Sequence, residues 1–412
     1  MNRKGDKSLI VGLDIGTSKV TALVGEYSPG APIEVIGIGS HESRGLKRGV
    51  VVDIESTVQS IQRAVEEAEL MAGCEVRSVY ASISGNHVQC RNSQGIAPIR
   101  DGEVTYADLD RVLDAAKAVA IPADQRILHA IPRDYVLDDS QEGIRNPVGM
   151  TGVRLEVHAH LVVCAQSAAA NISKCVQRCG LQVDDLILGS LASSTAVLTP
   201  DERELGVVLV DIGAGTTDVA IFTNGAIRHT AVIPIAGDLI TSDIAMALRT
   251  PTKDAEDIKV ENGYVKQLLA DPETQVEVPG LGDRGPRMLS KQALAGVIEP
   301  RVEEIFSLVQ QVVRESGYEE VLSSGVVLTG GSAVMPGMVE LGEDIFLKPV
   351  RRGIPKYSSA LSDMVAQPRA ATVMGLLEEA RYARLRGFKV AQKNGSVKTA
   401  FGRFKDFIVG NF

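Results

Sequence analysis

The stretch VVLVDIGAGTTDVAIF, residues 207–222, decides the fold of this chain. Two apolar, β-branched runs flank a glycine-rich turn, which predicts a tight β-hairpin. Gly213 and Gly215 allow positive φ angles and close approach of backbone N–H groups to an anion, while Thr216 and Thr217 add hydroxyl donors. The turn is suited to hold a phosphate, although an ordinary glycine-rich hairpin has the same pattern.

Carboxylates stand at both ends of this turn. Asp211 and Asp218 would repel a bare phosphate. Their presence favours a hard cation such as Mg²⁺ between carboxylate and phosphate, held directly or through water.

The same pattern occurs near the N-terminus. Residues 10–24, IVGLDIGTSKVTALV, again read as strand, Asp-Ile-Gly, hydroxyl residues and strand. Asp14 aligns with Asp211, and Gly16 aligns with Gly213. The repeat predicts two related subdomains that face one cleft and hold one polyphosphate from both sides.

A third segment, VVLTGGSAVMPGM at residues 326–338, completes the set. A buried strand ends in Gly330, Gly331 and Ser332. We expect it to pass into a helix whose first turn contains Pro336, so that backbone can pack flat against a nucleotide.

Together these segments resemble the actin, Hsp70 and hexokinase superfamily of ATPases and, within it, the FtsA family of bacterial cell division proteins, over nearly the whole chain. The resemblance implies an α/β, actin-like two-lobed ATPase fold with an inserted 1C subdomain and a C-terminal amphipathic helix. It implies ATP and Mg²⁺ as ligands, with Asp14 and Asp211 holding the metal through its waters. The nucleotide-binding residues that it implies are Asp14, Gly16, Thr17, Ser18, Lys19, Asp211, Gly213, Gly215, Thr216, Thr217, Asp218, Gly237, Glu256, Lys259, Gly330, Gly331 and Ser332.

Glu256 and Lys259 lie in AEDIKVENG, residues 255–263, which resembles the family's helix beside the ribose and base. The two residues are also spaced i, i+3, so a surface ion pair is the alternative interpretation.

Composition limits the other possibilities. With 412 residues, of which 44% are apolar, the chain can form more than one domain. It shows neither a cleavable signal pattern nor the roughly 18 consecutive apolar residues of a membrane span, so we expect a cytoplasmic protein. The five cysteines are scattered. Cys175 and Cys179 share a helix face, which favours core packing over a metal site.

The resemblance also divides the chain. The expected parts are 1–81 (first part of subdomain 1A), 82–162 (inserted subdomain 1C), 163–205 (rest of 1A), 206–227 (first part of 2A), 228–310 (subdomain 2B), 311–365 (rest of 2A), 366–385 (a helix that returns to 1A), 386–398 (a basic linker) and 399–412 (a membrane-targeting amphipathic helix). Residues 189–198 and 367–380 are expected to be paired helices whose small residues pack closely as a hinge, or simply alanine-rich core helices.

The inserted part is expected to be a compact module of strands and one helix. Thr105 and Asp108 mark the helix start, and residues 153–163 alternate as a half-buried strand. His158 and His160 could hold a metal at this spacing, but no third ligand is evident, and the alternation turns both to solvent. By resemblance, the module serves self-association into filaments and contact with other division proteins.

Residues 290–313 read as a long amphipathic helix. By resemblance, Arg301 and Glu304 on this helix receive the C-terminal tail of the tubulin-like FtsZ. A solvated face of mixed charge is the alternative.

The end of the chain is basic and aromatic, whereas the whole chain has a formal net charge of −9. Residues 399–412 predict a helix that lies in an anionic membrane surface, with a docked intramolecular tail as the alternative. The acidic body argues against nucleic-acid binding. The expected membrane residues are Phe401, Arg403, Phe404, Lys405, Phe407, Ile408 and Phe412.

These features predict an ATP-binding cell division protein with at most weak ATPase activity. It would self-assemble, tether FtsZ to the inner face of the cytoplasmic membrane at the division site and recruit other division proteins. A sugar kinase of the same fold is the alternative, but phosphoryl transfer would explain neither the 82–162 module nor the terminal helix. An Hsp70-type chaperone would need a further domain after residue 380.

Overall fold

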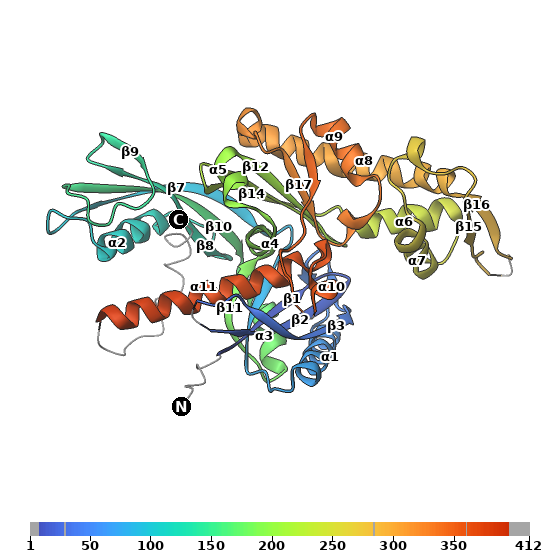
Figure 1. The fold of residues 1–412 in the computed structure, drawn as a ribbon, viewed down its shortest axis with the longest axis horizontal. Helices are drawn as coiled ribbons and strands as arrows, with labels where there is room; N and C mark the ends of the chain where they lie inside the picture. Colours follow the sequence, from blue (N-terminus) through green and yellow to red (C-terminus); the bar gives the residue numbers. More distant parts are fainter. Residues whose placement is uncertain (1–7, 29, 283–284, 360, 395–412) are drawn as a thin grey trace.

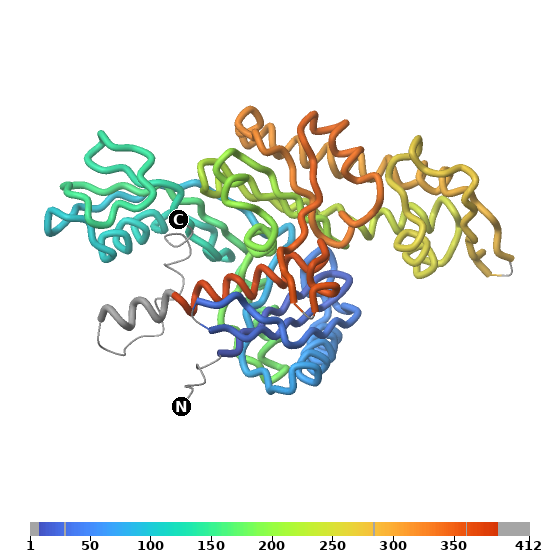
Figure 2. The backbone as a smooth tube through the Cα atoms, in the orientation of Figure 1, coloured from blue at the N-terminus to red at the C-terminus, as the bar shows by residue number. Residues whose placement is uncertain are grey.

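The computed structural model describes residues 8–28, 30–282, 285–359 and 361–394, with side chains described through residue 385. Within these ranges the chain forms two five-stranded sheets, one four-stranded sheet and two short hairpins. Figure 1 shows two central lobes, with the four-stranded sheet at one end of the molecule and a helical extension at the other. The tube in Figure 2 follows the same path.

The first lobe is built on a sheet of order β11-β6-β1-β2-β3. β1, β2 and β3 form an antiparallel meander, and β6 and β11 add parallel strands beside β1. Four consecutive residues of β1 and of β2 are buried, as in strands covered on both faces. The strands are β1 (Ser8–Ile15), β2 (Lys19–Tyr27), β3 (Glu34–Glu42), β6 (Ser78–Ile83) and β11 (Gln182–Leu188).

The second lobe repeats this arrangement. Its sheet has the order β14-β13-β12-β17-β18, again with three antiparallel strands followed by two parallel ones. The two related halves predicted from the repeated hairpin are therefore present. The strands are β12 (Val207–Ile212), β13 (Thr217–Thr223), β14 (Ala226–Ile233), β17 (Val326–Thr329) and β18 (Val350–Arg352).

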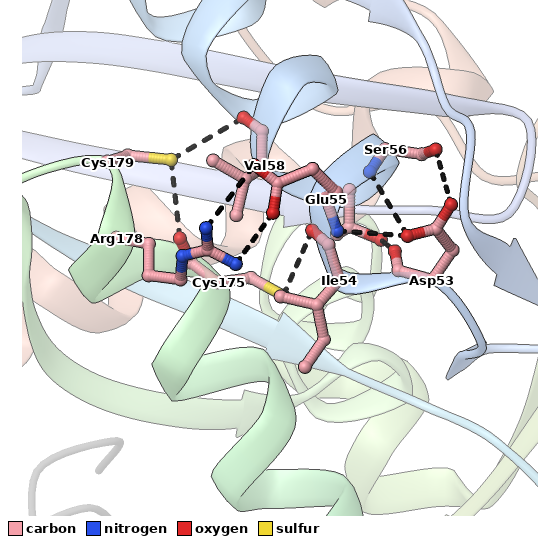
Figure 3. Close-up of polar contacts among 9 residues, drawn as sticks. Asp53, Ile54, Glu55, Ser56, Val58, Cys175, Arg178 and Cys179 are labelled. Carbon is pink, nitrogen blue, oxygen red and sulfur yellow. Dashed lines mark hydrogen bonds and ion pairs between the residues drawn. The ribbon is translucent and has the colours of Figure 1, made fainter.

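Helix α1 (Ile54–Ala72) packs beside α3 (Gln166–Arg178) in the first lobe. The Asp53 carboxylate caps α1 by accepting the Glu55 N–H at 3.0 Å, and Gly73 ends the helix in the left-handed region. Figure 3 shows the Cys175 and Cys179 thiols directed at carbonyls of α1, at 4.0 Å and 3.5 Å. Both cysteines are thus part of the helix packing, as the sequence predicted.

The expected helix pair is formed by α4 (Gly189–Val197) and α11 (Ala371–Asn394), which lie against each other between the lobes. A Cβ atom at Gly375 would lie 1.8 Å from the Ala192 carbonyl oxygen, so the two backbones are in direct contact. α11 continues to Asn394, so the basic linker expected from residue 386 is helical up to that point. Lys, Arg, Ala and Gln favour helix, which explains the extension.

The inserted module is a sheet of order β7-β10-β8-β9 with α2 on one face and its own apolar core. Thr105 caps α2 in a capping box with Asp108, as predicted. The elements are β7 (Gln89–Pro98), α2 (Tyr106–Lys117), β8 (Gln125–Leu137), β9 (Gln141–Ile144) and β10 (Arg154–Ala165).

The extension at the opposite end is mostly helical (Figure 1). Its longest helix runs from Lys291 to Ser316 and is capped by the Ser290 hydroxyl, which accepts the Ala293 N–H at 3.2 Å. The expected limits at residues 227 and 310 fall inside β14 and α8, so they do not coincide with element ends. The elements are α6 (Gly237–Leu248), α7 (Thr252–Asn262), β15 (Gln275–Val278), β16 (Arg287–Ser290) and α8 (Lys291–Ser316).

The segment after β17 differs from the prediction. A short 3₁₀ turn (Ser332–Val334) follows Gly331, and α9 begins only at Met338, so Pro336 lies before the helix rather than in its first turn. Gly337, at φ 90°, redirects the chain between the two. Remaining short elements are β4 (Leu46–Lys47), β5 (Val50–Val51), α5 (Pro200–Leu205), α9 (Met338–Phe346) and α10 (Ser362–Val365).

Among the helices that the structure describes, none is both long enough and apolar enough to cross a membrane. The predicted membrane helix, residues 399–412, lies outside the described residues.

Candidate functional site

The two glycine turns are closed by the same hydrogen bond. The Gly16 N–H donates to the Lys19 carbonyl at 3.0 Å, and the Gly213 N–H donates to the Thr216 carbonyl at 2.9 Å. The alignment of Asp14 with Asp211 and of Gly16 with Gly213 therefore holds at the level of backbone geometry.

Glycine is required in these turns for space rather than for backbone conformation. The positive φ angles expected at Gly213 and Gly215 are wrong, because neither residue has one. A Cβ atom at Gly215 would instead lie 2.5 Å from the Thr17 hydroxyl, in the turn of the other lobe. The glycine thus lets the two turns approach each other closely.

Three carboxyl groups line this junction; Asp218 is buried, and Asp14 and Asp211 are partly buried. Burial, opposed by a hydrogen bond from Ser82 and assisted by the nearby Asp211 carboxylate, raises the pKa of Asp14 to about 6. Burial also raises the pKa of Asp218 to about 7, with added repulsion from Asp211 and Asp14. The pKa of Asp211 is raised by burial as well. A cation would relieve this repulsion.

Three hydroxyl groups that sequence reasoning missed hold these carboxylates. Ser82 donates to Asp14 at 2.7 Å, Ser84 donates to Asp218 at 2.6 Å and Thr372 donates to Asp211 at 3.1 Å. Ser82 and Ser84 lie at the end of β6, next to β1 in the sheet. The carboxyl ends of parallel strands meet at one edge of a sheet, which is the signal that could have indicated them.

The Ser84–Asp218 bond joins the two lobes directly, since Ser84 belongs to the first lobe and Asp218 to the second. Thr216 also donates to Asp218, at 2.9 Å. The carboxylates and both turns therefore form one site at the junction.

The carboxylates at this junction can supply only part of the coordination sphere of Mg²⁺. The described part of the chain holds no group of three or more His, Cys, Asp or Glu side chains placed to bind one metal ion. Asp14 and Asp211 can supply one or two oxygens, directly or through water. Mg²⁺ usually keeps several waters and takes further oxygens from substrate phosphates, so such a partial set suits it.

The turn after β17 brings in the third predicted segment. Gly330 has φ 89°, and a Cβ atom there would lie 2.5 Å from the Asp211 carboxylate. The Ser332 hydroxyl donates to the Gly213 carbonyl at 2.9 Å. A Cβ atom at Gly331, by contrast, would meet no described atom within 4 Å, so this residue borders open space at the site.

Lys259 and Glu256 are not a surface pair, because Lys259 is buried. Its ammonium group lies 2.6 Å from the Glu256 carboxylate and donates to the Gly237 carbonyl at 3.1 Å and to the Thr241 hydroxyl at 2.8 Å. Gly237 in turn donates its N–H to the Gly213 carbonyl at 3.1 Å. α6 and α7 are thereby attached to the glycine turn of the second lobe.

Four other residues that were predicted to bind the nucleotide make other contacts or are exposed. The Thr217 hydroxyl is fully buried and donates to the Ile235 carbonyl at 2.7 Å, so it is used inside the second lobe. Thr17 accepts the Gly49 N–H at 3.1 Å, whereas Ser18 and Lys19 are exposed.

The prediction that both module histidines face solvent is wrong for His160. That side chain is fully buried and lies 3.0 Å from the Thr230 hydroxyl of β14, with Asn92 on its other ring nitrogen at 3.2 Å. Burial lowers the pKa of His160 to about 3, so its ring is neutral. The outer face of the module's sheet is covered here by the second lobe, a contact that no local pattern reveals.

Arg301 on α8 is already paired. It binds both oxygens of Asp243 on α6, at 2.6 and 3.0 Å, and also contacts Glu304. The predicted membrane residues, 401 to 412, lie outside the described residues.

Two protein-family models match this chain. A family model described as "Cell division protein FtsA" matches residues 208–375, and a second, described as "SHS2 domain inserted in FTSA", matches residues 85–163. The second match confirms an inserted module.

Two solved structures share the fold. The PilM-PilN type IV pilus biogenesis complex matches with a TM-score of 0.65 at 18% identity, over 90% of this chain and 98% of that chain. MreB 5 of Spiroplasma citri bound to AMPPNP matches with a TM-score of 0.56 at 15% identity, over 96% of this chain and 100% of that one. These likenesses confirm the actin-like ATPase fold.

A full-length relative decides the family. The cell division protein FtsA of Pseudomonas aeruginosa is 57% identical over 410 residues, which cover 98% of each chain. The chain therefore belongs to the FtsA family of cell division proteins.

Proposed function

We propose that this chain is an ATP-binding, self-assembling adaptor that tethers FtsZ to the inner face of the cell membrane at the division site and recruits other division proteins. The observation that carries the proposal is the junction of the lobes, where two equivalent glycine turns, three carboxyl groups with raised pKa values and the open space at Gly331 come together. Such a site suits a nucleotide whose phosphates lie between the lobes and whose base lies beside the Gly330–Gly331 turn.

ATP is the favoured nucleotide, with Mg²⁺ as its counter-ion. The MreB 5 structure of the same fold carries AMPPNP, which supports an adenine nucleotide here. Bound Mg²⁺ would supply positive charge between the phosphates and the carboxylates, while Asp14 and Asp211 would orient its waters. Because Ser84 and Asp218 join the lobes at this point, ATP acts mainly as a ligand that sets lobe conformation and assembly, with at most weak hydrolysis.

Membrane attachment would come from residues 399–412. If five large apolar side chains are half buried, at roughly 1 kcal/mol apiece, they contribute on the order of 5 kcal/mol before the cost of ordering the helix. One such helix is a reversible anchor. Several helices on one assembly bind stably through avidity, so membrane binding and self-assembly support each other.

The partner surfaces are the inserted module for self-association and other division proteins, and the region of Arg301 and Glu304 for the FtsZ tail. The module has its own core, as an independent interaction unit requires. Arg301 and Glu304 are both partly exposed on α8. Membership in a cell division family favours this adaptor over a sugar kinase.

Vesicle sedimentation tests the proposal. With ATP and Mg²⁺ present, purified FtsZ should pellet with vesicles that contain anionic lipid only when the full-length chain is added. Truncation after Val397, or Phe404→Glu, should leave both proteins in the supernatant without changing ATP binding, because each change removes apolar area from the helix.

Asp406→Asn, on the opposite side of that helix, is the matched control and should pellet like wild type. FtsZ that remains in the supernatant while the chain pellets would reject the tether. Equal sedimentation of the truncated chain would reject the anchor.

A further inference from the structure

A pocket of about 460 Å³ lies where the inserted module meets the second lobe. β8 and β10 of the module form one side, and β14 with the turn before it forms the other; Figure 1 shows these strands beside one another. The charged and polar side chains that line it are Arg133, Asp134, Glu142, Arg145, His158, Asn224 and Arg228. The pocket is separate from the glycine turns, and the proposed function does not use it.

Most of the charges in this pocket are paired. Asp134 accepts hydrogen bonds from His158 at 2.5 Å and from Arg228 at 3.0 Å. Although burial raises the pKa of Asp134, these two partners hold it below its usual value. Arg145 forms an ion pair with Glu204 of the second lobe. Asp134 and Glu204 are thus already paired with cations.

Glu142 also lines the pocket; it is exposed and has no ion pair among the described residues. Arg133 is the unpaired cation. Within the described part of the chain its guanidinium makes no ion pair, and its one hydrogen bond is to the Tyr318 hydroxyl at 3.2 Å. Its Nε atom is buried and has no hydrogen-bond partner among the described residues. Arg133 as a whole is partly buried, and an oxyanion is the ligand that best satisfies an unpaired guanidinium in such a position.

We propose that this pocket binds a small anion that carries phosphate or carboxylate groups. Arg133 supplies the unpaired charge, and Arg145, Arg228 and the Asn224 amide offer further N–H donors around it. The volume lies within the range of small-molecule sites, about 300–1,000 Å³, and exceeds what one inorganic phosphate fills. The ligand is therefore a larger anion, such as a pyrophosphate or a polycarboxylate.

A bound anion would link two parts of the fold, because the two sides of the pocket belong to the inserted module and to the second lobe. Arg133 lies on the module, whereas Asn224 and Arg228 lie on the second lobe. A bound anion bridges them and adds to the direct contacts of His160 and Asp134 across the same boundary. The ligand thus stabilises the docked position of the inserted module.

Calorimetric titration of the full-length protein with pyrophosphate, and separately with citrate, tests the site and distinguishes the two anion chemistries. We expect one of the two to bind with a single-site stoichiometry. Arg133→Gln and Asn224→Asp should each weaken it about tenfold or more, the first by removing the unpaired charge and the second by adding a negative one. Asn224 is exposed and has φ 52°, a conformation that Asp tolerates, so the second variant keeps the fold.

Two controls locate the site. Asn171→Asp makes the same substitution on α3, away from the pocket, and should bind like wild type. Gly331→Val alters the site at the glycine turns and should also leave this binding unchanged. Failure of both anions to bind, or binding that Arg133→Gln and Asn224→Asp leave unchanged, would overturn the proposal. Loss of binding in Gly331→Val would place the anion in the interlobe site and overturn it too.

Discussion

At the scale of single residues, Asp218 carries the clearest physical consequence. Burial raises its pKa to about 7, from an ordinary value of 3.8, and the neighbouring carboxylates add to the shift. Between about pH 4 and pH 7 the folded state therefore keeps a proton that the unfolded state has released. Stability falls with rising pH wherever the folded state binds more protons, so this group destabilises the nucleotide-free protein above pH 7.

Asp218→Asn should remove that penalty. Relative to wild type, we expect the variant's free energy of unfolding to improve by about 2–4 kcal/mol between pH 4 and pH 8, at about 1.4 kcal/mol per pKa unit. Urea unfolding of both proteins without nucleotide, across this pH range, gives the difference. A difference that stays constant with pH would show that Asp218 ionises normally.

Sequence reasoning predicted the carboxylates and glycines of the site but not the groups that hold them. Asp14, Asp211 and Gly213 stand in a repeated pattern that the chain itself displays. Ser82 reaches Asp14 through the pairing of β6 with β1, and Ser84 reaches Asp218 across the boundary between the lobes; a local pattern encodes neither contact. Lys259 was equally consistent with a surface pair, since its burial depends on how α7 packs on α6.

At the scale of elements, α4 and α11 are in direct backbone contact between the lobes. Glycine inside a helix costs about 1 kcal/mol relative to alanine, so Gly375 needs a compensating reason. The reason is the approach of α4, whose Ala192 carbonyl would lie 1.8 Å from an added Cβ. In the chain, α4 precedes the second lobe and α11 follows it, so the backbone contact between the two helices joins the segments on either side of that lobe.

Gly375→Ala should destabilise the protein by about 3 kcal/mol or more, because the two helices must separate to admit one methyl group. Thermal or urea unfolding measures the loss. Gly285→Ala is the matched control, since its Cβ would meet no described atom within 4 Å. Equal stability of the two variants would contradict the close packing.

Element type was predictable where periodicity and caps agree. The capping box of α2 and the glycine end of α1 are both read from the sequence. The ends of the elements were not predictable. α8 runs through residue 310 and α11 runs through residue 386, because nothing in the sequence stops either helix there. Pro336 was misplaced because a 3₁₀ turn replaces the expected helix start.

At the scale of the whole molecule, one apolar core extends from the first lobe onto β12, β13 and β17 of the second and onto β8 and β10 of the module, and polar contacts add to it. The inserted module meets the second lobe through His160 and Asp134, and the two lobes meet through Ser84 and Asp218. The inserted module and the two-lobed fold followed from the family resemblance, whereas these boundary contacts required the structure.

The proposed FtsZ site gives a prediction at this scale. Arg301→Glu should lower the affinity for an FtsZ tail peptide about tenfold or more by exchanging attraction for repulsion, while ATP binding stays unchanged. Because Arg301 also pairs with Asp243, the control is Asp243→Asn, which weakens the same pair but keeps the positive charge at 301. Fluorescence titration with labelled peptide would reject the site if Arg301→Glu and wild type bound equally.

The central claim is that the junction of the lobes binds Mg-ATP, and Gly331 tests it most directly. Gly331 has a helical backbone conformation and its Cβ would meet no described atom within 4 Å, so Gly331→Val should fold with unchanged stability. Its side chain would occupy the space assigned to the nucleotide. In a calorimetric titration with ATP and Mg²⁺, we predict one site in wild type and in the Gly285→Val control, and no detectable binding in Gly331→Val. Wild-type affinity in a folded Gly331→Val protein would contradict the account.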